Sequence, residues 1–277
     1  MSVERLERSF GMILGILLGL GLTGETHAKE GNAKVVIQKI EQRVQGTKKP
    51  VFIFDLDETI IDSTVRKYLS YQDAIDRVCA NATKASLESC EKARTVSVSD
   101  FQALTNRYDD RPLFESRGVA AHVYEELFKT SLPIYLSDRW IAEADSFLPG
   151  AGSFMKKLHS MRGEIFYASS RSLQDQRLGT LDSLYRLGLL KPGEEWKVAL
   201  KPNGEKSIEF KRRAFSAVGA WADKNGGEVV GVFENEPENM NALIELFPNA
   251  VPVFVKGAYL KAEPVREEAH QIRDFWF

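Results

Sequence analysis

The sequence predicts a doubly wound α/β fold in which a helical domain is inserted after the first strand. Short apolar runs alternate with stretches of helical periodicity, which is typical of βαβ units around a parallel sheet that is buried on both faces. Residues 62–147 interrupt this alternation directly after the first apolar run. The length of 277 residues suits one such core with an insertion, being too short for two full domains.

Five apolar runs are predicted as the strands of the core. They are VFIFDLD (Val51–Asp57), EIFYAS (Glu164–Ser169), KVAL (Lys197–Leu200), EVVGVF (Glu228–Phe233) and AVPVFV (Ala250–Val255). Pro252 cannot donate a hydrogen bond to a neighbouring strand, so the last run is predicted to lie at an edge of the sheet. Helices are predicted before and between these strands, at 29–49, 151–161, 173–187, 205–224 and 238–246.

The inserted stretch, residues 62–147, contains amphipathic helical segments, dispersed aromatic residues and no clear buried-strand run. Because it follows the first strand directly, we expect a helical cap over the carboxyl ends of the strands. The predicted core then consists of residues 29–61 and 148–277.

Composition excludes several classes of protein. Hydrophobic residues make up 43% of the chain and charged residues 27%, as in an ordinary globular protein. The 37 Lys and Arg against 39 Asp and Glu give a net charge of −2, whereas a nucleic-acid binder normally carries a basic surplus. We therefore expect a small-molecule partner and no nucleic acid polymer.

Residues 1–28 have the order of a signal peptide. Arg5 and Arg8 precede the uncharged run 11–22, and small residues lie near a cleavage point at Ala28. Twelve helical residues span about 18 Å, less than the roughly 30 Å of a bilayer core, so an uncleaved membrane anchor is the lesser alternative. We expect a periplasmic or secreted protein with no stable membrane insertion after cleavage.

Export gives the two cysteines a role. Cys79 and Cys90 lie eleven positions apart, and in an oxidising compartment they could close a short disulfide loop. The alternative is two unpaired, buried small residues. Neither cysteine has a catalytic setting.

Ligands of a doubly wound sheet bind beyond the carboxyl ends of its strands, so the residues that end each strand are the candidate site. The first strand ends in Asp55 and Asp57, which strand alternation places on the same side. Two close carboxylates fit a hard cation such as Mg²⁺, and a carboxylate can also attack phosphorus. A second carboxyl group can protonate the departing alcohol. The alternative is an ordinary charged turn.

The second and third strands end in groups that suit a phosphoryl ligand. Ser169, Ser170 and Arg171 end the second strand, where a hydroxyl can donate to a phosphoryl oxygen or simply cap a helix. Lys201 and Lys206 follow the third strand, and a lysine there can neutralise phosphoryl charge, although most lysines are merely solvated.

The fourth strand ends in Glu234, with Glu238 four residues later across a turn into a helix. This pair suits a metal ion, and the alternative is an acidic helix start. Four successive strand ends thus supply carboxylates, a hydroxyl, a lysine and carboxylates, the groups that metal-assisted phosphoryl transfer needs. In contrast, the run Lys211–Arg213 is interpreted as the solvated face of a helix.

Three segments resemble the haloacid dehalogenase-like superfamily, and within it the secreted acid phosphatases of class B and class C. DLDET (Asp55–Thr59) fits the first motif of the superfamily, DxDx[TV], and IFYASSRS (Ile165–Ser172) looks like the second motif of those phosphatases. LGTLDSLYRLGL (Leu178–Leu189) is similar to the helix that follows it. The fourth motif departs from the family's GDxxxD, because Phe233 and Glu234 replace Gly and Asp and Glu238 replaces the second Asp.

The resemblance implies a role for each matched position. Asp55 would be the nucleophile, Asp57 the general acid and base, and Ser169 a phosphoryl ligand. Lys206 would be the lysine of the third motif, with Lys201 as its competitor. The implied ligands of Mg²⁺ are Asp55, Asp57, Glu234 and Glu238. The residues implied to bind substrate are Thr59, Ser170, Arg171 and Lys201.

Together these observations predict an exported, Mg²⁺-dependent phosphomonoesterase, similar to an acid phosphatase, that acts through an aspartyl-phosphate. A phosphotransferase with the same mechanism and a catalytically weak protein that binds phosphate ligands are the alternatives. Neither the identity of the phosphomonoester nor the oligomeric state is indicated by the sequence.

Overall fold

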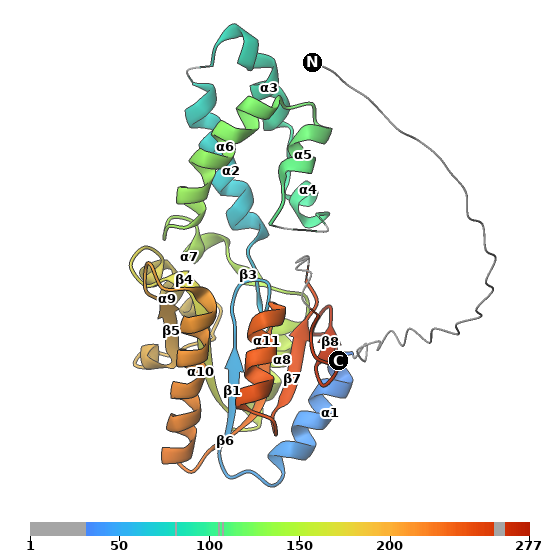
Figure 1. The fold of residues 1–277 in the computed structure, drawn as a ribbon, viewed down its shortest axis with the longest axis vertical. Helices are drawn as coiled ribbons and strands as arrows, with labels where there is room; N and C mark the ends of the chain where they lie inside the picture. The colour runs from blue at the N-terminus through green and yellow to red at the C-terminus, as the bar shows by residue number, and fades with distance from the viewer. Residues whose placement is uncertain (1–31, 81, 105, 107, 258–263) are drawn as a thin grey trace, which may run out of the picture.

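The computed structural model describes residues 32–80, 82–104, 106, 108–257 and 264–277 (Figure 1). The predicted signal peptide, residues 1–28, lies outside this part of the chain. Within the described residues, no helix combines the length and the apolar character needed to cross a bilayer.

The core is a six-stranded sheet in which all paired strands are parallel, with the order β5-β4-β1-β6-β7-β8. Its strands are β1 (Pro50–Phe54), β4 (Glu164–Ser172), β5 (Val198–Lys201), β6 (Glu228–Glu234), β7 (Val251–Val255) and β8 (His270–Ile272). Helices cover both faces of the sheet (Figure 1). The predicted doubly wound α/β fold is therefore confirmed.

The strand order fixes where a ligand would bind. After β1 the chain builds β4 and β5 on one side, and it then returns to build β6, β7 and β8 on the other. The carboxyl end of β1 thus lies at the topological switch point, where parallel sheets leave a crevice for ligands.

The prediction that Ala250–Val255 forms an edge strand is wrong, because β8 pairs with β7 and takes the edge position. Pro252 is tolerated because β8 pairs only with Val253–Val255, so Pro252 lies in a part of β7 that is open on one side. The short strand β8 was not predicted.

Strand β1 separates two apolar layers. Phe52 and Phe54 point into one layer, whereas Val51 and Ile53 point into the other, as strand alternation requires. The first layer is closed by α1 (Ala33–Val44), α8 (Ala151–Ser160) and α9 (Arg177–Arg186). The second is closed by α10 (Ser207–Lys224) and α11 (Pro237–Leu246). Strand β1, and with it the position of Asp55, is therefore held by an apolar core on each face.

The inserted helical domain, called the cap below, lies between two short strands that pair antiparallel, β2 (Ile61–Asp62) and β3 (Ser146–Phe147). It stands beyond the end of β1 in Figure 1. Its helices are α2 (Thr64–Cys79), α3 (Lys84–Arg94), α4 (Val98–Gln102), α5 (Arg111–Ser116), α6 (Ala121–Tyr135) and α7 (Ile141–Ala144).

The cap has an apolar core of its own, in which Tyr71, Phe101 and Phe114 pack together. Cys79 and Cys90 form a disulfide that joins α2 to α3, with a Cα–Cα distance of 5.8 Å, so the predicted pairing is present. The aromatic residues noted in the sequence therefore serve largely to build this second core.

Candidate active site

Asp55 is placed by the sheet itself. It follows the last residue of β1, and its backbone N–H donates to the carbonyl of Phe233 in β6 at 3.0 Å. A tight turn then begins, in which the amides of Ile60 and Ile61 both donate to the carbonyl of Leu56 at 3.0 Å. Glu58 takes a positive φ of 57° in this turn, a conformation that non-glycine residues adopt rarely and often beside functional sites.

The carboxylates that end β1 and β6 share one buried lysine. Lys211 of α10 lies with its Nζ 2.5 Å from Asp55 Oδ1 and 2.9 Å from Glu234 Oε2. Only 1% of the Lys211 side chain is exposed. Thr59 Oγ1 donates to the other Asp55 oxygen at 2.9 Å. Asp55 is therefore oriented through both of its oxygens.

One lysine cannot neutralise two buried carboxylates. Burial, followed by the charge of Asp55, raises the pKa of Glu234 to about 8, although two backbone amides donate to its Oε1. Burial alone would lower the pKa of Lys211, but the charges of Asp55 and Glu234 raise it above the ordinary value. Both shifts have one cause, the crowding of two carboxyl groups around a single buried ammonium.

Asp57 lies in a different electrostatic environment, between two arginines. Its Oδ1 accepts from Nη2 of Arg171 at 2.6 Å and from Nη2 of Arg66 at 2.7 Å, and its Oδ2 accepts from Arg171 Nε at 2.8 Å. Burial opposes ionisation of Asp57, yet the charges of Arg171 and Arg66 hold its pKa well below the usual range. Asp57 is therefore ionised in this arrangement.

A second buried carboxylate balances the two arginines. Asp145, whose side chain is fully buried, contacts Arg171 Nη2 at 2.7 Å and Arg66 Nη1 at 3.3 Å. Arg66 belongs to helix α2 of the cap, and Asp145 precedes strand β3, which leads back to the core. This network of two arginines and two aspartates thus ties the base of the cap to the end of β1.

These groups surround a cavity of about 190 Å³ at the switch point of the sheet. Besides Asp55, Asp57, Lys211 and Glu234, it is lined by Arg66, Tyr108, Tyr135, Leu136, Ser169, Ser170, Arg171, Gln176, Asn235, Glu236 and Asn239. Asn235 Nδ2 is buried and has no hydrogen-bond partner among the described residues. The cavity therefore combines a carboxylate with hydroxyl, amide and cationic groups that suit an oxyanion ligand.

Four residues predicted for the site do not line the cavity. The side chain of Lys206 is 79% exposed, and its Nζ lies 3.4 Å from Glu209. Lys201 is the last residue of β5. Neither lysine lines the cavity. Glu238 is exposed in the first turn of α11, because the turn after β6 directs Glu236, not Glu238, toward the cavity. Thr59 does not line the cavity either and supports Asp55 from behind.

Lys211 occupies the place that the sequence assigned to Lys206, and its interpretation as part of a solvated face is wrong. The signal was present, since Lys211 shares a stripe of helical spacing with Phe215, Val218 and Ala222, all buried. A cation on an apolar stripe requires a buried partner. Arg66 was missed for the same reason, because it lies four residues before Ser70 on the buried face of α2.

The predicted four-carboxylate metal site is not assembled. The described residues contain no group of three or more His, Cys, Asp or Glu side chains arranged to hold a metal ion. Asp57 is committed to its arginines and Glu238 points away. Mg²⁺, however, needs only one or two carboxylates when water and substrate oxygens complete its shell. Asp55 and Glu234 are two oxygen donors at the same cavity and meet that smaller requirement in number, but Lys211 lies between them, so an ion held by both requires the lysine to move.

Comparisons with known proteins give weak likenesses only. No family model matches the chain, and no curated protein matches it. Among solved structures, the chain is similar to a haloacid dehalogenase-like family protein from Streptococcus pneumoniae, with 10% identity, a TM-score of 0.44 and coverage of 81% of this chain and 92% of that one.

A hydrolase from Pseudomonas syringae has 16% identity and a TM-score of 0.40 over 82% of this chain and 93% of its own. A beta-phosphoglucomutase from Clostridium difficile has 17% identity and a TM-score of 0.33 over 74% of this chain and 83% of its own. These values are too low to assign a family or an activity.

Proposed function

We propose that this protein hydrolyses phosphomonoesters and that Asp55 is its nucleophile. The observation that carries the proposal is the buried contact between Asp55 and Lys211 at the switch point of the sheet. The DLDET motif at Asp55–Thr59, with its resemblance to the haloacid dehalogenase-like superfamily, supports the same assignment.

The reaction would proceed in two steps. A carboxylate oxygen of Asp55 forms a bond to phosphorus, the bond from phosphorus to the ester oxygen breaks, and the departing oxygen takes up a proton. Water then attacks the phosphorus of the aspartyl-phosphate, which releases inorganic phosphate and restores the Asp55 carboxylate. Lys211, held against Asp55, would orient that carboxylate and offset the negative charge of the phosphoryl group.

Several groups of the cavity would hold the phosphoryl oxygens. Ser169 is buried at the end of β4 and lines the cavity, and its hydroxyl is a donor of the right kind. The unpartnered Nδ2 of Asn235 is a second donor at the end of β6. These residues come from the two strands that flank β1, so they surround the nucleophile.

Asp57 would serve as general acid and base only after a change in its contacts. Both arginines stabilise its ionised form, so protonation of Asp57 requires that at least one of them move away. Arg66 belongs to the cap, whereas Arg171 belongs to the sheet. We infer that a movement of the cap relative to the core releases Arg66 and raises the pKa of Asp57.

Mg²⁺ is part of the proposal as the cofactor. Asp55 and Glu234 would hold it, and the ion would supply positive charge beside the phosphoryl group. A proton on Glu234 would have to leave for the ion to bind, so binding is expected to strengthen as pH rises toward 8. Export, through the sequence at 1–28, remains a proposal of the same kind.

The test is release of inorganic phosphate from 4-nitrophenyl phosphate by the purified protein, with Mg²⁺ or with a chelator. Asp55→Asn and Lys211→Met are compared with Lys206→Met, a matched change of lysine outside the cavity. Metal-dependent release that is abolished by the first two changes and retained by the third supports the proposal. No release from any phosphomonoester with any divalent metal would favour a phosphate-binding protein instead.

A further inference from the structure

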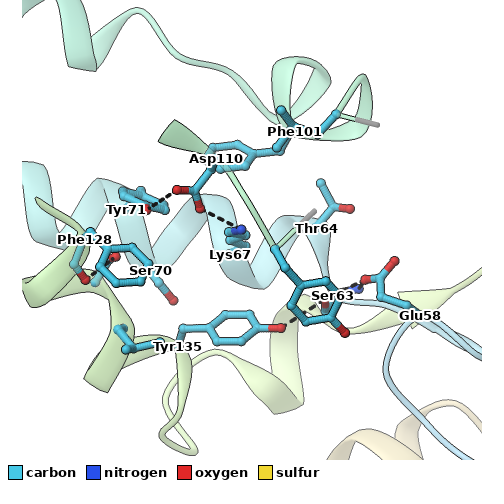
Figure 2. A pocket seen from close by; sticks show the side chains of 14 residues that line it. Glu58, Ser63, Thr64, Lys67, Ser70, Tyr71, Phe101, Asp110, Phe128 and Tyr135 are labelled. Carbon is cyan, nitrogen blue, oxygen red and sulfur yellow. Dashed lines mark hydrogen bonds and ion pairs between the residues drawn. The ribbon is translucent and has the colours of Figure 1, made fainter. Parts of the chain in front are cut away.

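A second cavity, of about 240 Å³, lies within the cap. Figure 2 shows its lining, in which aromatic side chains from α2, α4 and α6 surround a space beside Ser63 and Thr64. The lining residues are Glu58, Ser63, Thr64, Lys67, Ser70, Tyr71, Phe101, Leu104, Tyr108, Asp110, Phe128, Ser131, Leu132 and Tyr135.

This cap cavity adjoins the cavity of Asp55. Tyr108 and Tyr135 line both, so the two spaces meet at these side chains. Tyr135 is fixed at the junction, because its hydroxyl lies 3.1 Å from Arg66 Nη2 and donates to Ser63 Oγ at 3.2 Å. A molecule that is bound at Asp55 through a phosphoryl group therefore has the cap cavity as its neighbouring space.

Most polar side chains at the cap cavity already have partners in the protein. Asp110 accepts from Tyr71 at 2.8 Å and lies 2.6 Å from Lys67 Nζ, as Figure 2 shows. Ser63 donates to Glu58 at 2.7 Å. The hydroxyls of Ser70 and Ser131 donate to backbone carbonyls within their own helices, at 2.8 Å and 3.1 Å.

The surface that remains for a ligand is therefore largely apolar. It is formed by the rings of Phe101, Phe128 and Tyr135 and by the side chains of Leu104 and Leu132. One exception is Thr64, whose Oγ1 is buried without a hydrogen-bond partner among the described residues. Polar groups of a ligand that face the apolar part of this lining would be buried without partners, at a cost in affinity.

The volume sets an upper limit on the size of the occupant. An apolar cavity of about 150 Å³ is enough to hold benzene. A cavity of about 240 Å³ has room for a substituted ring or a small fused ring system.

We propose that the cap cavity binds the leaving group of the substrate and that this group is an apolar, ring-bearing alcohol or phenol. The proposal rests on the phosphatase function proposed above. It predicts weak binding of sugars and polyols, because several of their hydroxyl groups would face the apolar part of this lining.

The first measurement compares two esters of primary alcohols, 2-phenylethyl phosphate and glycerol 1-phosphate, so that the departing oxygens are similar in kind. Full-length protein is assayed for phosphate release with Mg²⁺. Burial of about 100 Å² of ring surface corresponds to a preference of roughly 50-fold in kcat/KM for the phenylethyl ester. Equal values, or a preference for the glycerol ester, would overturn the assignment of the leaving group.

A matched pair of variants locates the effect. Leu132→Glu places a carboxylate in the cap cavity, at a side chain that is 40% exposed, so folding does not require burial of the charge. Leu87→Glu makes the same change at a cap residue that is 47% exposed and does not line the cavity. We expect Leu132→Glu to lose at least tenfold in kcat/KM for the phenylethyl ester and less than threefold for the glycerol ester, and Leu87→Glu to change neither.

A binding measurement separates this inference from the proposed reaction. Fluorescence titration with 2-naphthol, an apolar ring alcohol, needs no turnover and can be made on Asp55→Asn as well as on the wild type. We expect binding in both, weakened at least tenfold by Leu132→Glu and unchanged by Leu87→Glu. Binding that is absent, or equally strong in both leucine variants, overturns the inference. If no ester is hydrolysed at all, the proposed function fails, whatever the naphthol result.

Discussion

Replacement of Lys211 by methionine tests the assignment on which the proposed reaction depends. Methionine has nearly the length of lysine and fills the same space, but it removes the ammonium group that lies 2.5 Å from Asp55 and 2.9 Å from Glu234. The matched control is Lys206→Met, which removes an equal charge from a side chain that is 79% exposed.

The expected sizes of the effects follow from burial. Loss of a preorganised group that stabilises charge in a transition state costs about 3–4 kcal/mol, so kcat should fall by 10²- to 10³-fold in Lys211→Met. Removal of one partner of a buried pair destabilises by up to 3–5 kcal/mol. We expect the lower end, about 3 kcal/mol, because Glu234, whose pKa is already raised, can take up a proton when the lysine is absent, which leaves only Asp55 without its counter-charge. Lys206→Met should change stability by less than about 0.5 kcal/mol.

The assay pairs phosphate release with urea unfolding of the same preparations, so that a loss of activity can be separated from a loss of fold. Activity is measured without urea, and only on variants that the unfolding curve shows to be folded under that condition. Full activity in Lys211→Met would refute the assignment of Lys211. A large loss of activity in Lys206→Met would return Lys206 to the role that the sequence gave it.

Three further predictions concern stability. Arg66→Met should lower the free energy of unfolding in urea by about 3–5 kcal/mol at pH 7. Because the pKa of Asp57 is lowered in the folded state, this loss in the free energy of unfolding should be complete above about pH 4 and should shrink below it. A loss that is the same at every pH would contradict the pairing of Arg66 with Asp57. The Tm of Glu234→Gln should rise relative to that of the metal-free wild type as the pH increases from about 5 to 8. The reason is that the raised pKa makes the folded wild type hold a proton that the unfolded chain has lost, which lowers the stability of the wild type over this range. A difference in Tm that does not change with pH would mean that Glu234 is ionised throughout. The double change Cys79→Ser with Cys90→Ser should lower the free energy of unfolding in urea by about 3 kcal/mol, and reduction of the wild type should have the same effect. No loss of stability in either case would show that the disulfide does not stabilise the cap.

The fold could be predicted because parallel strands buried on both faces leave continuous apolar runs in the sequence. The runs that became β1, β4, β5, β6 and β7 were all of this kind. Strand β8 was missed because HQI at His270–Ile272 has neither the length nor the apolar content of such a run. Because β8 was missed, β7 with its Pro252 was predicted to be the edge strand, whereas β8 takes that position in the sheet.

The candidate site was predictable where residues are carried by strand ends. Asp55, Asp57, Ser169 and Glu234 line one cavity because topology alone brings the carboxyl ends of neighbouring strands together. Glu238 belongs to the helix beyond its strand, and no rule of strand topology fixes the direction of its side chain.

Residues carried by helices needed a different argument. Lys206 precedes α10, and its proximity to the third strand in sequence suggested contact with the site. Side chains of a helix, however, tilt toward its N-terminus, so the lysine that reaches the strand ends lies one turn further along, at Lys211. The apolar stripe of α10 would have identified Lys211, and the stripe of α2 would have identified Arg66.

The most direct test of the proposed reaction is detection of the phosphorylated enzyme. Protein mixed briefly with an aryl phosphate and Mg²⁺ is quenched in acid, which preserves acyl phosphates, and its peptides are examined by mass spectrometry. We predict a phosphoryl group on the peptide that contains Asp55, formed and lost at rates that match turnover, and no such group in Asp55→Asn. Turnover without a phosphorylated Asp55, or phosphorylation that persists in Asp55→Asn, would contradict the assignment of the nucleophile.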